Sequence, residues 1–223
     1  MSLEYRRRRL AVILIGWTAV LMLSAVPQAA CAQRLADDLG VAVANDRANE
    51  VRALLARGAD PNAKDANGEP MLIAAARGGS VATVDALLAG RADANIRNRY
   101  GDTALMIAAL NGHLDVMKKL RARSAEINNA GWTALIYAAT SGHDDAVRYL
   151  LAEGADVNAA SPNGTTALMM AVREGRGSTV DLLIVRGADV NRRNQNNASA
   201  LEWAKRNNDA ALVARLQRAG AKE

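Results

Sequence analysis

Cysteine and aromatic residues are almost missing from this sequence. Its 223 residues include one cysteine, three tryptophans, four tyrosines and no phenylalanine. A single cysteine forms neither an intramolecular disulfide nor a zinc site of several thiolates, so the fold has to be held together by packing. With so few aromatic side chains, those at solvent-facing positions are candidates for partner contacts, because tryptophan and tyrosine are enriched among the residues that dominate binding energy.

Residue patterns that serve catalysis or metal binding are missing as well. His113 and His143 are the two histidines, and we interpret both as structural, with rings hydrogen-bonded to adjacent loops. No phosphate-binding glycine loop, nucleophile elbow or His-Glu-x-x-His motif occurs. The sequence therefore predicts no enzyme activity, no cofactor and no metal site.

Acidic and amide side chains recur in the connectors, and we interpret them as turn residues that bond their own backbone. No calcium loop with a distal glutamate surrounds them. These residues are Asp60, Asn62, Asp93, Asn95, Asp156, Asn158, Asp189 and Asn191.

A strong excess of one charge is also absent outside the N-terminus. The formal net charge is +5, and residues 1–32, with four arginines and one glutamate, hold +3 of it. The remaining 24 basic and 22 acidic residues nearly balance. Because nucleic-acid-binding domains concentrate positive charge in their folded part, we expect no nucleic-acid partner.

The N-terminal segment has the order of features typical of a secretory signal peptide. Four arginines precede an apolar stretch over 10–26, and an Ala-Cys-Ala segment follows it. These small residues predict cleavage between Ala32 and Gln33, so that 1–32 is a signal peptide and the mature chain, 33–223, is periplasmic. The alternative is that the apolar stretch stays in place as a membrane anchor.

The sequence does contain a repeat with a period near 33 residues. Five turn residues recur at intervals of 33, 30, 33 and 33 residues: Gly68, Gly101, Gly131, Gly164 and Asn197. Each opens a block such as Gly-Asp-Thr-Ala-Leu, followed by two apolar patterns with helical spacing and a turn-rich connector. A fixed period of this length indicates stacked helical units. The Thr or Ser of the block is placed to cap the next helix.

These blocks resemble ankyrin repeats. The shared residues are Gly-x-Thr-Ala-Leu-x-x-Ala-Ala, then Gly-His, then Leu-Leu, and finally Gly-Ala-Asp-x-Asn. The resemblance implies an all-α ankyrin-repeat solenoid of about six helix-turn-helix units with short β-hairpin turns. The expected units within 33–223 are 36–65, 66–98, 99–129, 130–160, 161–193 and 194–221.

The sequence departs from the family pattern in three respects. The Thr-Pro-Leu-His box reads Thr-Ala-Leu-Met or Thr-Ala-Leu-Ile, so the usual Thr–His hydrogen bond cannot form. Arg91 and Ser124 stand where a left-handed glycine is expected, which predicts strained helix ends. The connector before Gly131 is three residues short, which predicts a short hairpin there.

The resemblance also implies that a partner protein binds the concave face, formed by the hairpin tips and the first helix of each unit. Tyr100 and Trp132 project from neighbouring turns, and the arginines of this face are placed to pair with carboxylates. We expect Tyr137, Tyr149 and Trp203 to pack at inward or inter-repeat positions. The predicted partner-binding residues are Arg77, Arg99, Tyr100, Asp102, Leu110, Asn111, Trp132, Thr140, Ser141, Arg173, Glu174, Gln195 and Arg206.

Together, the predicted signal peptide and the repeats make this chain similar to small exported, periplasmic ankyrin-repeat proteins of bacteria. Some of these support an antioxidant enzyme such as catalase, which implies a monomeric accessory or protective factor for a partner enzyme. Two alternatives remain at this stage. One is an inhibitor or immunity protein that binds a toxic enzyme, and the other is a membrane-tethered scaffold.

Overall fold

The structure, a computed structural model, describes residues 30–222. The predicted signal peptide lies outside them except for its last three residues, which are helical and exposed. No helix within the described range is long and apolar enough to cross a membrane.

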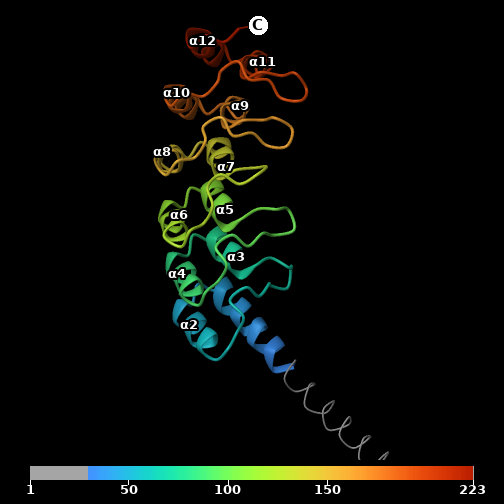
Figure 1. Cartoon of the computed structure of the whole chain (residues 1–223), viewed down its shortest axis with the longest axis vertical. Helices are drawn as coiled ribbons and strands as arrows, with labels where there is room; N and C mark the ends of the chain where they lie inside the picture. The colour runs from blue at the N-terminus through green and yellow to red at the C-terminus, as the bar shows by residue number, and fades with distance from the viewer. Residues whose placement is uncertain (1–29, 223) are drawn as a thin grey trace, which may run out of the picture.

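Helices follow one another in antiparallel pairs along a curved stack (Figure 1). The first pair is a helix ending at residue 44 and α2 (Ala48–Ala56). The later pairs are α3 (Met71–Arg77) with α4 (Val81–Ala89), α5 (Ala104–Leu110) with α6 (Leu114–Arg121), α7 (Ala134–Ser141) with α8 (Asp144–Ala152), α9 (Ala167–Arg173) with α10 (Gly177–Val185), and α11 (Ala200–Arg206) with α12 (Ala210–Arg218). The predicted all-α repeat solenoid is confirmed for this part of the chain.

The pairs build two columns of helices. The inner helices α3, α5, α7, α9 and α11 stack on one another, and the outer helices α2, α4, α6, α8, α10 and α12 form a second column beside them, on the left in Figure 1. Hairpin loops project from the inner column, away from the outer one. Three of them carry an isolated antiparallel bridge, such as Lys64 with Pro70. The hairpin before α7 reaches less far than its neighbours, as its short connector predicts.

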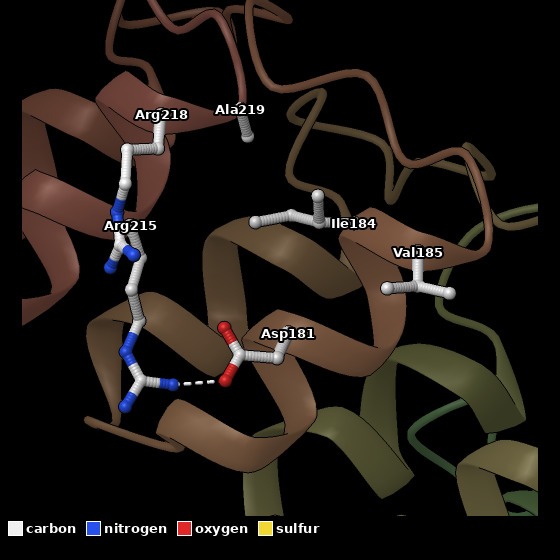
Figure 2. Close-up of a pocket in the computed structure, with 6 residues that line it drawn as sticks. All are labelled: Asp181, Ile184, Val185, Arg215, Arg218 and Ala219. Atoms are coloured by element: carbon white, nitrogen blue, oxygen red, sulfur yellow. Dashed lines mark hydrogen bonds and ion pairs between the residues drawn. The ribbon is translucent and has the colours of Figure 1, made fainter.

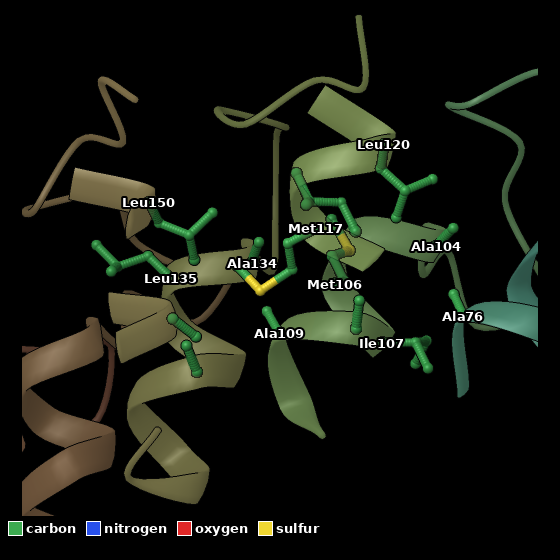
Figure 3. Packing of buried hydrophobic residues seen from close by; sticks show 14 of the residues in the cluster. Ala76, Ala104, Met106, Ile107, Ala109, Met117, Leu120, Ala134, Leu135 and Leu150 are labelled. Atoms are coloured by element: carbon green, nitrogen blue, oxygen red, sulfur yellow. The ribbon is translucent and has the colours of Figure 1, made fainter. Parts of the chain in front are cut away.

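One continuous apolar core runs through the stack. Small side chains such as Ala76, Ala104 and Ala134 are buried where inner helices face each other, so the helix backbones approach closely (Figure 3). Met106 of α5 and Met117 of α6 fill the space between the two columns. Because each unit buries its apolar faces only against its neighbours, the stack is stable only as an array.

Side-chain oxygens cap four of the inner helices as predicted. Thr103, Thr133, Thr166 and Ser199 each accept a hydrogen bond from the backbone N–H three residues further on, at 3.3–3.4 Å. Such caps contribute about 1 kcal/mol each. Arg91 and Ser124, which follow the outer helices α4 and α6, adopt left-handed φ angles of 69° and 62°, as predicted. A left-handed conformation costs a residue with a side chain about 1–2 kcal/mol.

A ladder of asparagine amides joins the connectors of successive units. Asn62 Oδ1 accepts a hydrogen bond from the backbone N–H of Asp93 at 2.8 Å. The same bond recurs at 2.8–2.9 Å in four further pairs: Asn95 with Glu126, Asn128 with Asp156, Asn158 with Asp189, and Asn191 with Lys222. The prediction that these asparagines bond their own turns is therefore wrong. The aspartates do so, as Asp60 Oδ1 accepts from the Asn62 N–H at 2.9 Å.

Candidate protein-binding surface

Two large aromatic side chains are exposed on the hairpin side of the stack. Tyr100 is 71% exposed and Trp132 is 37% exposed. They belong to the hairpins that precede α5 and α7, two inner helices that pack directly against each other. An aromatic ring loses hydrophobic stabilisation when it stays in water, so the exposed rings on adjacent hairpins make this region the candidate contact surface.

A third aromatic residue connects these two hairpins. The ring of Tyr137, on α7, lies 5.8 Å from that of Trp132 between centroids, with the planes tilted by 42°. Its hydroxyl donates a hydrogen bond of 2.6 Å to Asp102 Oδ1 in the preceding unit. Burial, and then the hydrogen bond to Asp102 and its negative charge, raise the pKa of Tyr137 above its usual value, so the hydroxyl keeps its proton.

The loop that carries Tyr100 is fixed by one amide side chain. Asn98 Oδ1 accepts hydrogen bonds from the backbone N–H groups of Tyr100 and Asp102, at 2.9 and 3.0 Å. The Arg99 guanidinium lies over the Tyr100 ring, 4.8 Å from its centroid. Arg99, Tyr100, Asp102, Trp132 and Tyr137 thus form one ordered patch, called the aromatic surface below.

The other predicted arginines differ in their surroundings. Arg77 donates to Glu69 at 2.7 Å, and Arg173 donates to its neighbour Glu174 at 2.9 Å. Both guanidinium groups are therefore neutralised within the chain. Arg206, at the end of α11, is exposed, and its charge is among the influences that lower the pKa of Glu202, after the hydrogen bond from Arg193.

Three of the remaining predicted residues bond the main chain, and one of them, Gln195, bonds Pro162 of the preceding unit. The side chains of Asn111, Thr140 and Gln195 donate to main-chain carbonyls at 3.1, 2.8 and 2.7 Å. Leu110 and Ser141 are half-buried at the ends of α5 and α7. These residues shape the face, and only the aromatic surface combines exposed rings with charge.

A family model of ankyrin repeats, in three copies, matches residues 39–130, 74–161 and 124–194. The chain belongs to the ankyrin-repeat family. No curated protein matches it significantly. Ankyrin repeats are protein–protein interaction modules, typically without enzymatic activity, and they generally bind protein partners.

Tyr137 is the member of the aromatic surface that sequence reasoning assigned to inward packing. It is half-buried and does pack against the core. Its ring also contacts that of Trp132, and its hydroxyl donates a hydrogen bond to Asp102. The signal that could have found it is its position four residues after the N-cap Thr133, on the inner helix that follows Trp132.

The side chains of His113 and Arg176 link successive units of this ankyrin stack. His113 Nε2 lies 3.2 Å from the carbonyl oxygen of Arg77 in the preceding unit, which confirms the structural interpretation of this residue. Arg176 occupies the equivalent place further along and donates to the Thr140 carbonyl at 3.2 Å. Between residues 30 and 222, no group of three or more histidine, cysteine or acidic side chains is placed to hold a metal ion.

A hollow of about 570 Å³ opens on the outer column, between α10 and α12 (Figure 2). Asp181 and Arg215 form an ion pair across it, and Ile184 and Val185 line it together with Arg218. Val185 is 81% exposed. All residues that line this hollow lie on α10, on α12 or directly after α12, so it is separate from the aromatic surface.

Proposed function

We propose that this chain is an exported ankyrin-repeat protein that binds one partner protein in the periplasm through the aromatic surface. The observation that carries the proposal is the pair of exposed rings, Tyr100 and Trp132, on adjacent hairpins. The chain has only seven tryptophans and tyrosines in all, three and four respectively. Truncation of such residues at the centre of an interface typically costs 2 kcal/mol or more, roughly a thirtyfold loss of affinity.

Preorganisation supports the same function. Asn98 fixes the hairpin backbone, and Tyr137 holds both Trp132 and Asp102. A surface that is already ordered loses little conformational entropy when a partner docks. The aromatic surface therefore needs no rearrangement before binding.

The partner that we propose is an enzyme of the same compartment, such as a catalase, for which the chain is an accessory or protective factor. Two features support this choice: the order of charged, apolar and small residues in the N-terminal segment, and the resemblance to small periplasmic ankyrin proteins. Periplasmic fractionation and N-terminal sequencing test the export step. A mature chain that starts at Gln33 supports it, and an intact N-terminus in the membrane fraction contradicts it.

Crosslinking and co-purification of a tagged chain test the binding step. We expect a stoichiometric partner that is lost with Trp132→Ala and with Tyr100→Ala. Val185→Ala is the matched control, because it removes an exposed apolar side chain from the outer column. Retention of the partner by both aromatic variants would refute the proposed surface, and a toxic enzyme as the captured partner would make the chain an inhibitor instead.

A further inference from the structure

We propose that the partner presents a carboxylate beside an apolar side chain, and that Arg99, held over Tyr100, receives the carboxylate. This inference rests on the proposed function, since it specifies the chemistry of the partner at the aromatic surface. It depends on which arginines of this face are already paired with a carboxylate of the chain and which are not.

Arg99 is the arginine at the aromatic surface whose charge is left available. Arg77 and Arg173 each have a carboxylate of their own within 2.9 Å, so an incoming acid would have to displace Glu69 or Glu174. Across residues 30–222, Arg99 has no carboxylate partner, and its contact is with the face of the Tyr100 ring. Of Arg77, Arg99 and Arg173, Arg99 is therefore the one whose positive charge is not already paired with a carboxylate of the chain.

Within residues 30–222 the Arg99 guanidinium makes no hydrogen bond, so its N–H donors are available to a ligand. A guanidinium can lie over an aromatic ring and still bind a carboxylate in its own plane through two parallel N–H donors. Both contacts can exist at the same time. The contact with Tyr100 also restricts a long side chain that would otherwise lose rotamer entropy on binding, so Arg99 is prepared for the ligand.

A cationic partner group is disfavoured at the same place. The ring face of Tyr100 that would attract a positive charge already carries Arg99. The nearby Asp102 Oδ1 accepts a hydrogen bond of 2.6 Å from the Tyr137 hydroxyl, and Asp102 Oδ2 accepts one of 3.5 Å from Asn98 Nδ2. Charge complementarity at the aromatic surface thus favours an acid, while the exposed parts of Tyr100 and Trp132 favour an apolar neighbour beside it.

Selection from a random linear peptide library on the purified chain tests the proposal. Peptides that bind wild type and are lost on Trp132→Ala define ligands of the aromatic surface. We expect these peptides to be enriched in aspartate or glutamate next to an aliphatic or aromatic residue. A selected peptide should bind Arg99→Gln about ten- to a hundredfold more weakly, the range expected for a charge-assisted hydrogen bond.

Matched variants separate a direct role of Arg99 from a general electrostatic effect. Arg77→Gln removes the same charge from the same face, and we expect it to change affinity less than about threefold, because Glu69 already neutralises Arg77. Tyr100→Phe keeps the ring and should retain binding, whereas Tyr100→Leu should lose it. Arg99→Glu should bind the peptide whose acid is replaced by lysine better than it binds the original.

The outcomes distinguish this inference from the proposed function. Peptides that need Trp132 but show no acidic enrichment, or that bind Arg99→Gln as well as wild type, overturn the inference and leave the binding surface intact. Failure to obtain any peptide that depends on Trp132 overturns both. Equal unfolding midpoints for all variants ensure that lost binding is not lost folding.

Discussion

Substitution of Asn158 by alanine tests whether the asparagine ladder holds the units together. Asn158 lies in the connector after α8, and its side chain reaches the next connector. Its Oδ1 accepts from the Asp189 N–H at 2.8 Å, and its Nδ2 donates to the Gly187 carbonyl at 3.3 Å. The substitution therefore removes two bonds between units and leaves the apolar core untouched.

The expected cost follows from those two bonds. A neutral intramolecular hydrogen bond contributes about 0.5–1.5 kcal/mol net, so their loss should lower the free energy of unfolding by about 1–3 kcal/mol. The loss is concentrated at one boundary of a stack whose stability depends on contacts between neighbouring units. The Thr179–Asp144 bond of 2.6 Å still crosses that boundary, so we expect weakened rather than abolished coupling.

Tryptophan fluorescence in urea reports both sides of this boundary. Trp132 lies before it and Trp203 lies after it, so Trp132→Phe and Trp203→Phe each leave one of these two reporters in the stack. With Asn158→Ala, the Trp203 signal should be lost at lower urea than the Trp132 signal. Asn67→Ala is the control, because within residues 30–222 the side-chain amide of Asn67 makes no hydrogen bond, while its backbone N–H donates to Asp65 and is kept in the variant; a surface change of this kind stays within about 0.5 kcal/mol. An Asn158→Ala midpoint equal to that of the control would refute the reasoning.

Two further predictions concern contacts between units. Tyr137→Phe should destabilise the fold by about 1 kcal/mol near neutral pH, because Asp102 loses its donor. Since the folded pKa of Tyr137 is raised, its contribution is complete below the unfolded pKa of about 10 and declines above it, so denaturation curves of variant and wild type should converge in alkali. Gly79→Ala should cost more than 1 kcal/mol, because φ is +72° and the new Cβ would lie 2.8 Å from the His113 ring. Thermal unfolding should show a smaller cost of Gly79→Ala in a His113→Ala background, and an equal cost in both backgrounds would contradict the predicted clash.

Much of the fold could be predicted from the sequence, because repetition shows which residues share a structural role. Recurrence of Thr or Ser after four of the five turns predicted the helix caps, and the missing residues before Gly131 predicted the short hairpin. The asparagine ladder was not predicted. An asparagine in a turn bonds its own loop or another with equal chemical ease, and only the stacking distance between units decides which partner it reaches.

The sequence predicted which aromatic residues would be exposed on the candidate surface, but not which side chains would bond one another there. Exposure of Tyr100 and Trp132 follows from their places in the turns. The partners of the arginines do not, because Glu69 lies eight residues before Arg77 and meets it only once hairpin and helix are folded. Tyr137 was assigned to packing because one face of it does pack, while its polar tip bridges to another unit.

The position of the aromatic surface links binding to stacking. Asp102 belongs to the unit of α5, and Tyr137 and Trp132 belong to the unit of α7, so the hydrogen bond of 2.6 Å between Tyr137 and Asp102 crosses a boundary. A partner that contacts both hairpins binds only when these units are stacked. By mass action, such a partner stabilises the boundary by RT ln(1 + [L]/Kd). The contacts of Tyr137 with Asp102 and Trp132 order the aromatic surface before binding. Because one of them crosses the boundary between the units of α5 and α7, that boundary is the one that such a partner would stabilise.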